Sequence, residues 1–201
     1  MSNQPSAKYR ADYKSPDFSI THIDLDFFLD DTKTNVTAVS QVIRQNNEAT
    51  SLVLDGEDLK LVSLQINGTD WKDVEQSENT LTINNVPVSF TLTIKTEINP
   101  AGNTKLEGLY KSGDAFCTQC EAEGFRRITY YLDRPDVLAK FTTRVEADKA
   151  TFPYLLSNGN RVDSGELEGG RHWVKWEDPH AKPSYLFALV AGDFDVLRDN
   201  L

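Results

Sequence analysis

The sequence predicts an all-β domain, an antiparallel β-sandwich or a related architecture, with at most one or two short helices. Three observations support this prediction. Apolar and polar residues alternate over many short segments, Gly-rich and Asn-rich turns separate these segments, and very few segments have helical spacing. The length of 201 residues suits one large domain, and 39% hydrophobic residues are ordinary for a globular chain.

The predicted strands begin near residue 23. Residues 23–29 alternate between apolar and polar side chains, with one lapse at Phe28. Residues 36–43 are ambiguous, because their aliphatic residues have helical spacing while their Val and Thr content favours a strand; we predict a strand. Further strands are predicted over residues 59–66, 81–83, 90–94, 142–148, 153–156, 161–167, 171–176 and 185–190.

The remaining segments are the two ends of the chain and the single predicted helix. Residues 1–16 are polar and contain two prolines, which predicts an extended arm. A short helix is predicted to begin at Pro135, with Asp133 as its N-cap. No repeat or linker divides residues 17–193, so we expect them to form one domain. Residues 194–201 are neither a polar tail nor a finished strand, and we expect them to begin a connection to a further domain.

The charge balance disfavours nucleic acid as a partner. The chain has 31 Asp and Glu against 21 Lys and Arg, a net charge of −10, whereas phosphate contacts need clustered Lys and Arg. An acidic surface attracts cations, including protonated amines, although solubility alone also explains this charge.

The first residues and the apolar runs bear on localisation. The N-terminus lacks the apolar core of a signal peptide, and the longest apolar run, residues 186–191, is too short to span a bilayer. Two cysteines do not form the disulfide framework of a small secreted protein. We therefore expect a cytoplasmic protein with no membrane span.

No catalytic or metal site is predicted within the chain. Its three histidines do not form H-E-x-x-H, and neither a G-x-S-x-G elbow nor a phosphate-binding glycine loop occurs. Cys117 and Cys120 have the C-x-x-C spacing of redox motifs and of half a zinc site. The segment has no βαβ setting and the chain no second ligand pair, so two reduced, packed cysteines are the simpler interpretation.

One pair of side chains suggests a binding role. Gln119 and Glu121 are two residues apart, so on a strand both would point to one face. An amide oxygen and a carboxylate facing the same space can receive an ammonium group. Two plain alternatives remain open: a solvated strand face, or a Glu121 that pairs with Arg126 or Arg127.

The surrounding segment contains a longer pattern, which is Gln-x-Glu, then Arg-Arg, then Asp-x-Pro, at Gln119, Glu121, Arg126, Arg127, Asp133 and Pro135. This pattern resembles the N-terminal domain signature of the zinc aminopeptidases of the aminopeptidase N family, in its bacterial branch. Residues 107–112 and 185–194 also fit that family, and the similarity extends over the whole chain. Tyr130 and Tyr131 depart from the usual Pro and Cys, and Arg134 departs from the usual Glu.

The resemblance implies a saddle-like β-domain that docks on a downstream catalytic domain of the same polypeptide. That domain would supply the zinc ligands, and the full-length enzyme would release N-terminal amino acids from peptides. Gln119 and Glu121 would help bind the free α-ammonium of the substrate, which is mostly charged at neutral pH because its pKa is about 8. The chain alone would be inactive, with an exposed, partly apolar face near residues 117–125. The alternative is a stand-alone β-sandwich binding module.

Overall fold

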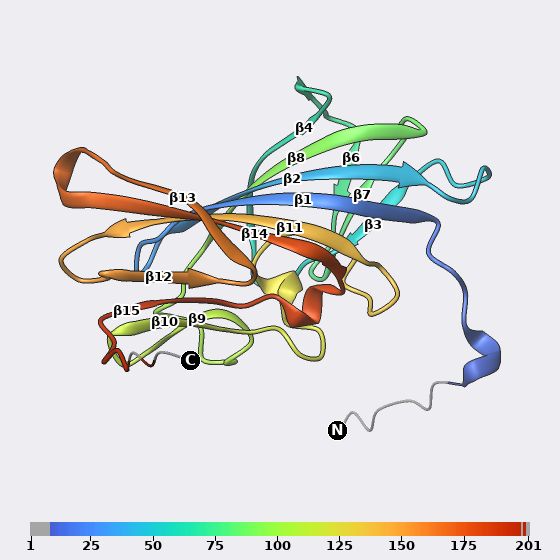
Figure 1. Cartoon of the computed structure of the whole chain (residues 1–201). Helices are drawn as coiled ribbons and strands as arrows, with labels where there is room; N and C mark the ends of the chain where they lie inside the picture. The colour runs from blue at the N-terminus through green and yellow to red at the C-terminus, as the bar shows by residue number, and fades with distance from the viewer. Residues whose placement is uncertain (1–8, 198, 200–201) are drawn as a thin grey trace, which may run out of the picture.

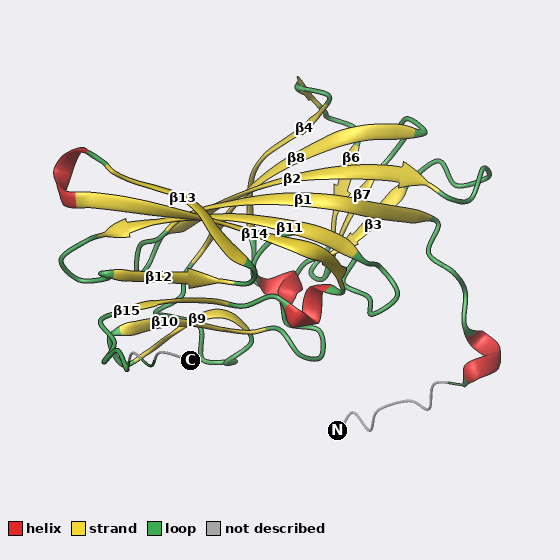
Figure 2. Cartoon of the chain, viewed as in Figure 1, coloured by secondary structure: helices red, strands yellow, loops and turns green. Residues whose placement is uncertain are grey.

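The computed structural model describes residues 9–197 and 199, and these residues form fifteen strands in three sheets (Figures 1 and 2). The predicted all-β class is confirmed. The described residues contain no α-helix; their only helical segments are four 3₁₀ turns of three residues each. These are η1 (Arg10–Asp12), η2 (Phe125–Arg127), η3 (Glu168–Gly170) and η4 (Ser184–Leu186).

An eight-stranded, twisted sheet forms the upper layer in Figure 1, in the order β13-β14-β11-β1-β2-β8-β4-β5. Its neighbours run antiparallel except for β1 and β11, which pair in parallel and thereby join the strands of the first half of the chain to those of the second half. The strands are β1 (Phe18–Phe28), β2 (Thr34–Arg44), β4 (Lys60–Ile66), β5 (Thr69–Asp70), β8 (Ser89–Ile98), β11 (Ala139–Asp148), β13 (Asn160–Glu166) and β14 (Arg171–Lys182).

Two smaller sheets complete the core. A four-stranded sheet, ordered β12-β15-β10-β9, lies below the large sheet in Figure 1, and a three-stranded sheet, ordered β3-β7-β6, lies toward the other end. Apolar residues of all three sheets belong to one buried cluster. The strands are β12 (Tyr154–Ser157), β15 (Leu189–Gly192), β10 (Ala115–Gln119), β9 (Gly108–Ser112), β3 (Leu52–Asp55), β7 (Thr80–Ile83) and β6 (Val74–Gln76).

Strand β1 shows how the sequence pattern becomes a buried face. Its alternate residues from Ile23 to Phe27 point into the core, and a bulge between Ile20 and His22 restores the same face for the residues before it. The lapse at Phe28 is also explained. Phe28 points outward and is 44% exposed, and the guanidinium of Arg171 lies 3.8 Å from the centre of its ring, which covers part of the apolar surface.

An aromatic cluster fills the core beneath η2. The ring centre of Phe125 lies 5.0 Å from that of Tyr131, 5.3 Å from that of Phe187 and 5.9 Å from that of Phe141. All three contacts are edge-to-face, the arrangement that aromatic rings favour. Phe125 is fully buried, so it anchors the residues that precede it to the core.

Some of the predicted elements were wrong, and some of the observed strands were not predicted. Residues 36–43 lie in strand β2, as predicted, but no helix begins at Pro135, where the chain makes only a turn. The predicted strand over residues 185–190 is partly the 3₁₀ turn η4, and β15 starts only at Leu189. Five strands, β3, β5, β6, β9 and β10, were not predicted, because they are short and their alternation is weak.

We expect Phe125→Ala to lower the free energy of unfolding by about 3–5 kcal/mol, because it removes a ring that contacts three others in a close-packed core. Urea unfolding of the chain measures this change. Leu138→Ala is the control, since Leu138 is 53% exposed and its truncation should stay within about 0.5 kcal/mol. Equal losses for both variants would contradict this view of the core.

Candidate functional site

Gln119 and Glu121 lie where β10 ends and a turn begins. Gln119 is the last residue of β10, paired with the first residue of β9, and Glu121 belongs to the following turn. The prediction that both lie on one strand face is therefore wrong. Both residues are nevertheless exposed, while Cys120 between them is 2% exposed and points inward.

The two residues meet through the main chain of Glu121. The amide nitrogen Nε2 of Gln119 donates a hydrogen bond of 3.2 Å to the backbone oxygen of Glu121. This bond leaves Oε1 of Gln119 as an available acceptor. The carboxylate of Glu121 makes no hydrogen bond or ion pair with any residue that the structure describes, so the alternative in which it pairs with Arg126 or Arg127 is not observed.

A tight turn follows, and Gly124 closes it. The Gly124 N–H donates to the backbone oxygen of Cys120 at 2.8 Å. A Cβ atom at Gly124 would lie 2.4 Å from the backbone oxygen of Gln119, a contact too short for any side chain. Only glycine therefore fits here without moving Gln119. We call residues 119–124 the 119–124 loop.

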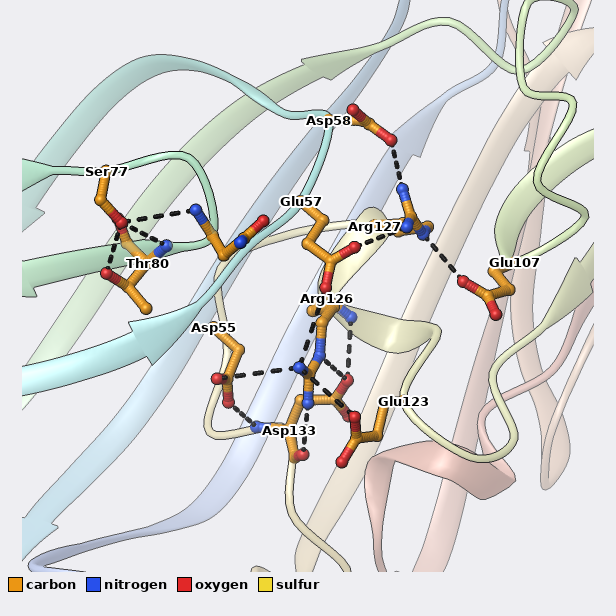
Figure 3. Close-up of polar contacts among 11 residues, drawn as sticks. Asp55, Glu57, Asp58, Ser77, Thr80, Glu107, Glu123, Arg126, Arg127 and Asp133 are labelled. Carbon is orange, nitrogen blue, oxygen red and sulfur yellow. Dashed lines mark hydrogen bonds and ion pairs between the residues drawn. The ribbon is translucent and has the colours of Figure 1, made fainter. Parts of the chain in front are cut away.

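The residues after the loop are fastened by a buried ion pair (Figure 3). Both the backbone N–H and Nε of Arg126 donate to Oδ2 of Asp133, at 3.2 and 2.9 Å, and Nη2 donates to the backbone oxygen of Asp133 at 3.1 Å. The other carboxylate oxygen, Oδ1, accepts a 2.6 Å bond from the hydroxyl of Ser184 in η4. The Asp133 side chain is only 1% exposed, so its charge depends on these donors.

Further carboxylates surround the two arginines. Nη1 of Arg126 lies within 4.0 Å of Asp55, Glu57 and Glu123, as Figure 3 shows. Each side-chain nitrogen of Arg127 has its own carboxylate: Nε that of Glu107, Nη1 that of Asp58 and Nη2 that of Glu57. Six carboxylates thus face two guanidinium groups, which leaves the region net negative.

The pKa shifts follow from this crowding. Burial raises the pKa of Asp55 above its ordinary value, against the lowering effect of Arg126. Burial lowers the pKa of Arg126, but its hydrogen bond to Asp133 and the nearby negative charges outweigh burial, and the net shift is upward. Arg126 therefore keeps its positive charge.

Comparison with known proteins identifies the family of the chain. Residues 11–186 match the family Peptidase M1 N-terminal domain. The chain belongs to this family. The resemblance to bacterial aminopeptidase N is also confirmed. Aminopeptidase N of Escherichia coli K12 is 66% identical over 199 residues, and that of Haemophilus influenzae is 59% identical over 196 residues. These alignments cover 99% and 96% of this chain but only 23% of either relative, so the chain spans about a quarter of their length.

Solved structures share the fold of this M1 N-terminal domain. Legionella pneumophila aminopeptidase A, in complex with aspartic acid, aligns with a TM-score of 0.87 and 39% identity over 92% of this chain and 22% of that one. An M1 zinc metallopeptidase from Deinococcus radiodurans aligns with a TM-score of 0.77 over 89% of this chain and 43% of that one. The second is only 18% identical, so it supports the fold alone.

The surroundings of the 119–124 loop in this M1 N-terminal domain differ from the partly apolar face that we predicted. Cys120 and Phe125 are buried, and the exposed side chains are those of Gln119, Glu121, Ala122 and Glu123. The exposed part of residues 117–125 is mostly polar. Asp55 and Glu57 were not predicted as neighbours of Arg126, because no sequence signal connects residues about 70 positions apart.

No set of three or more His, Cys, Asp or Glu side chains among residues 9–197 and 199 lies close enough together to hold a metal ion. His22 contacts Asp24 and Thr142, and His172 contacts the backbone oxygen of Phe152. Among the same residues, no helix is long and apolar enough to cross a membrane.

Both cysteines are free thiols, which agrees with the simpler interpretation of the C-x-x-C spacing. Cys117 is half-buried in β10. Burial, with a smaller contribution from the charge of Asp133, raises the pKa of the Cys120 thiol well above its usual range. A thiol held in its protonated form is a poor nucleophile, so Cys120 does not have the environment of a redox-active cysteine.

We expect iodoacetamide at pH 8 to modify Cys117 of the native chain and to leave Cys120 intact. Cys120 should react only when urea exposes it, because its thiol is buried and protonated. Mass spectrometry of tryptic peptides locates the modified residue, and Cys117→Ser should abolish native labelling. Rapid modification of Cys120 in the folded chain would contradict this description.

Proposed function

We propose that this chain is the N-terminal domain of a cytoplasmic zinc aminopeptidase that releases N-terminal amino acids from peptides. In this proposal residues 17–193 form a domain that docks on a downstream catalytic domain, residues 194–201 begin the connection, and Gln119 and Glu121 help bind the α-ammonium of the substrate. One observation carries the site assignment: the Glu121 carboxylate is exposed and unpaired within the described residues, on a loop that is fastened on both sides.

The chemistry of an exopeptidase requires such a group. The enzyme must recognise the end of a chain, and the free α-ammonium is what distinguishes the first residue from all the others. A carboxylate held at one distance from the reaction centre binds the ammonium and positions the first carbonyl. Glu121 supplies the charge, and Oε1 of Gln119 supplies a neutral acceptor beside it.

Zinc belongs to the other part of the proposed enzyme. It would be held by residues outside this chain and would supply Lewis-acid activation of water and of the scissile carbonyl. The role of this chain is to bind and orient. Glu123, 57% exposed on the same loop, lies 3.6 Å from Nη1 of Arg126. Six carboxylates around the two arginines nevertheless leave this region net negative, which favours the approach of a cation.

A stand-alone β-sandwich binding module is not favoured. The curated relatives extend far beyond the matched region, which is 23% of aminopeptidase N from two species. A catalytic domain in the same polypeptide is therefore the partner that these relatives support.

In the full-length enzyme, we expect Glu121→Ala to damage hydrolysis of a free-amine substrate more than Gln119→Ala. Loss of a charged partner from a desolvated pair costs on the order of 2–5 kcal/mol, roughly a 30-fold to several thousand-fold loss in kcat/KM. Loss of a neutral acceptor costs about 1–2 kcal/mol. KM should rise, because the ammonium is bound in the ground state as well as in the transition state.

Two controls make this test specific. Glu168→Ala removes an exposed glutamate from the turn η3 and should leave kcat/KM unchanged. An N-acetylated substrate has no ammonium, so the native enzyme should hydrolyse it very poorly and Glu121→Ala should reduce that rate little further. A Glu121→Ala enzyme with native kcat/KM on the free-amine substrate would rule out the assigned role.

We also expect the 201-residue chain on its own to retain no stoichiometric zinc after dialysis and to cleave no chromogenic amino-acid amide. The reason is that the proposal places the zinc ligands and the reacting groups in the downstream domain. Metal analysis and an amidase assay check this. Stoichiometric zinc together with turnover would overturn the proposed division between the two domains.

A further inference from the structure

Glu121 has no side-chain partner among the described residues, even though two arginines follow it closely in the chain. Arg126 and Arg127 lie five and six residues after it, and a flexible loop would let either of them reach its carboxylate. Such a pair would neutralise Glu121 and compete directly with a substrate ammonium. The contacts that hold the two arginines elsewhere therefore decide whether Glu121 stays available to a substrate.

The donors of Arg126 are directed elsewhere. Its Nε and backbone N–H both bind Oδ2 of Asp133, and Nη2 binds the Asp133 backbone oxygen. The planar fork of a guanidinium can make the Nε and Nη2 bonds together, whereas the compact ammonium of a lysine cannot. The remaining nitrogen, Nη1, faces Asp55, Glu57 and Glu123.

Asp133 is itself held from two further elements. Ser184 in η4 donates to its Oδ1 at 2.6 Å, and its backbone N–H donates to Oδ2 of Asp55 at 3.1 Å. Backbone bonds of 2.8 and 3.0 Å between Asp55 and Tyr131 fix the same segment to the end of β3. The partner of Arg126 therefore cannot shift without disturbing η4 and β3.

We propose that Arg126 and Asp133 are positioning residues for amine binding. Their ion pair fixes the end of the 119–124 loop and keeps Arg126 away from Glu121, so that the carboxylate stays available to the substrate ammonium. Neither residue touches the substrate; both act through Glu121. This inference rests on the proposed function, because it assigns a support to the same site.

The test is a double-mutant cycle in the full-length enzyme, with Arg126→Lys made in the native and in the Glu121→Ala background. Lysine keeps the positive charge but lacks the planar guanidinium that makes the Nε and Nη2 bonds to Asp133. In the native background we expect kcat/KM on a free-amine substrate to fall at least tenfold, since a displacement of about 1 Å can cost up to about 10²-fold. In the Glu121→Ala background the same change should alter kcat/KM by no more than about twofold.

Arg171→Lys is the matched control. Arg171 is also a largely buried arginine, bonded through Nε to Glu146 at 2.9 Å and through Nη2 to the backbone oxygen of Leu29. The Arg171→Lys enzyme should lose thermal stability as the Arg126→Lys enzyme does, but it should keep native kcat/KM. If Arg126→Lys does not fold, Ser184→Ala replaces it, because it removes only the 2.6 Å bond to Asp133 and should give a smaller loss that again vanishes without Glu121.

The outcomes separate the two claims. An equal loss from Arg126→Lys in both backgrounds, or no loss where Glu121→Ala is damaging, would overturn the positioning role and leave the amine-binding role of Glu121 standing. A silent Glu121→Ala would overturn the amine-binding role, and the positioning role with it.

Discussion

The ion pair between Arg126 and Asp133 is the interaction on which the candidate site depends. The Asp133 carboxylate is only 1% exposed, and such a group is costly to hold in its charged form unless donors surround it. Here the guanidinium of Arg126, the backbone N–H of Arg126 and the hydroxyl of Ser184 all donate to it. The pair joins η2, η4 and the end of β3 at one point. The shape of the loop before η2, and so the place of Glu121, follows from that junction.

The sheet topology explains why these partners meet at all. The parallel contact between β1 and β11 joins β1, β2, β4, β5 and β8 of the first half of the chain to β11, β13 and β14 of the second half in one large sheet. The segment between them must pass beneath this sheet, where Phe125 fills the aromatic cluster. Arg126 and Arg127 then face carboxylates at and after the end of β3, and Gln119, Glu121, Ala122 and Glu123 of the 119–124 loop remain exposed.

Local patterning predicted much of the large sheet but little of what surrounds the loop. Alternation was sufficient for β1, and Val and Thr content was sufficient for β2, although its aliphatic residues have helical spacing. The capping signal was misleading at Pro135, because the carboxylate of Asp133, the expected N-cap, instead binds Arg126 and Ser184. The two-residue spacing was misleading at Glu121, since β10 ends at Gln119. Tertiary contacts set where β10 ends and which side chains bind Asp133. The functional roles of Gln119 and Glu121 were inferred from the family resemblance and stay predictions.

A crystal structure of the full-length enzyme with a free amino acid bound tests the role of Glu121 most directly. We expect the α-ammonium to lie at hydrogen-bond distance, about 2.7–3.2 Å, from a carboxylate oxygen of Glu121. We also expect the loop to keep its contact between Gln119 and Glu121, and Arg126 to remain bound to Asp133. An ammonium held entirely by other residues, with Glu121 paired to an arginine or lysine, would contradict this role.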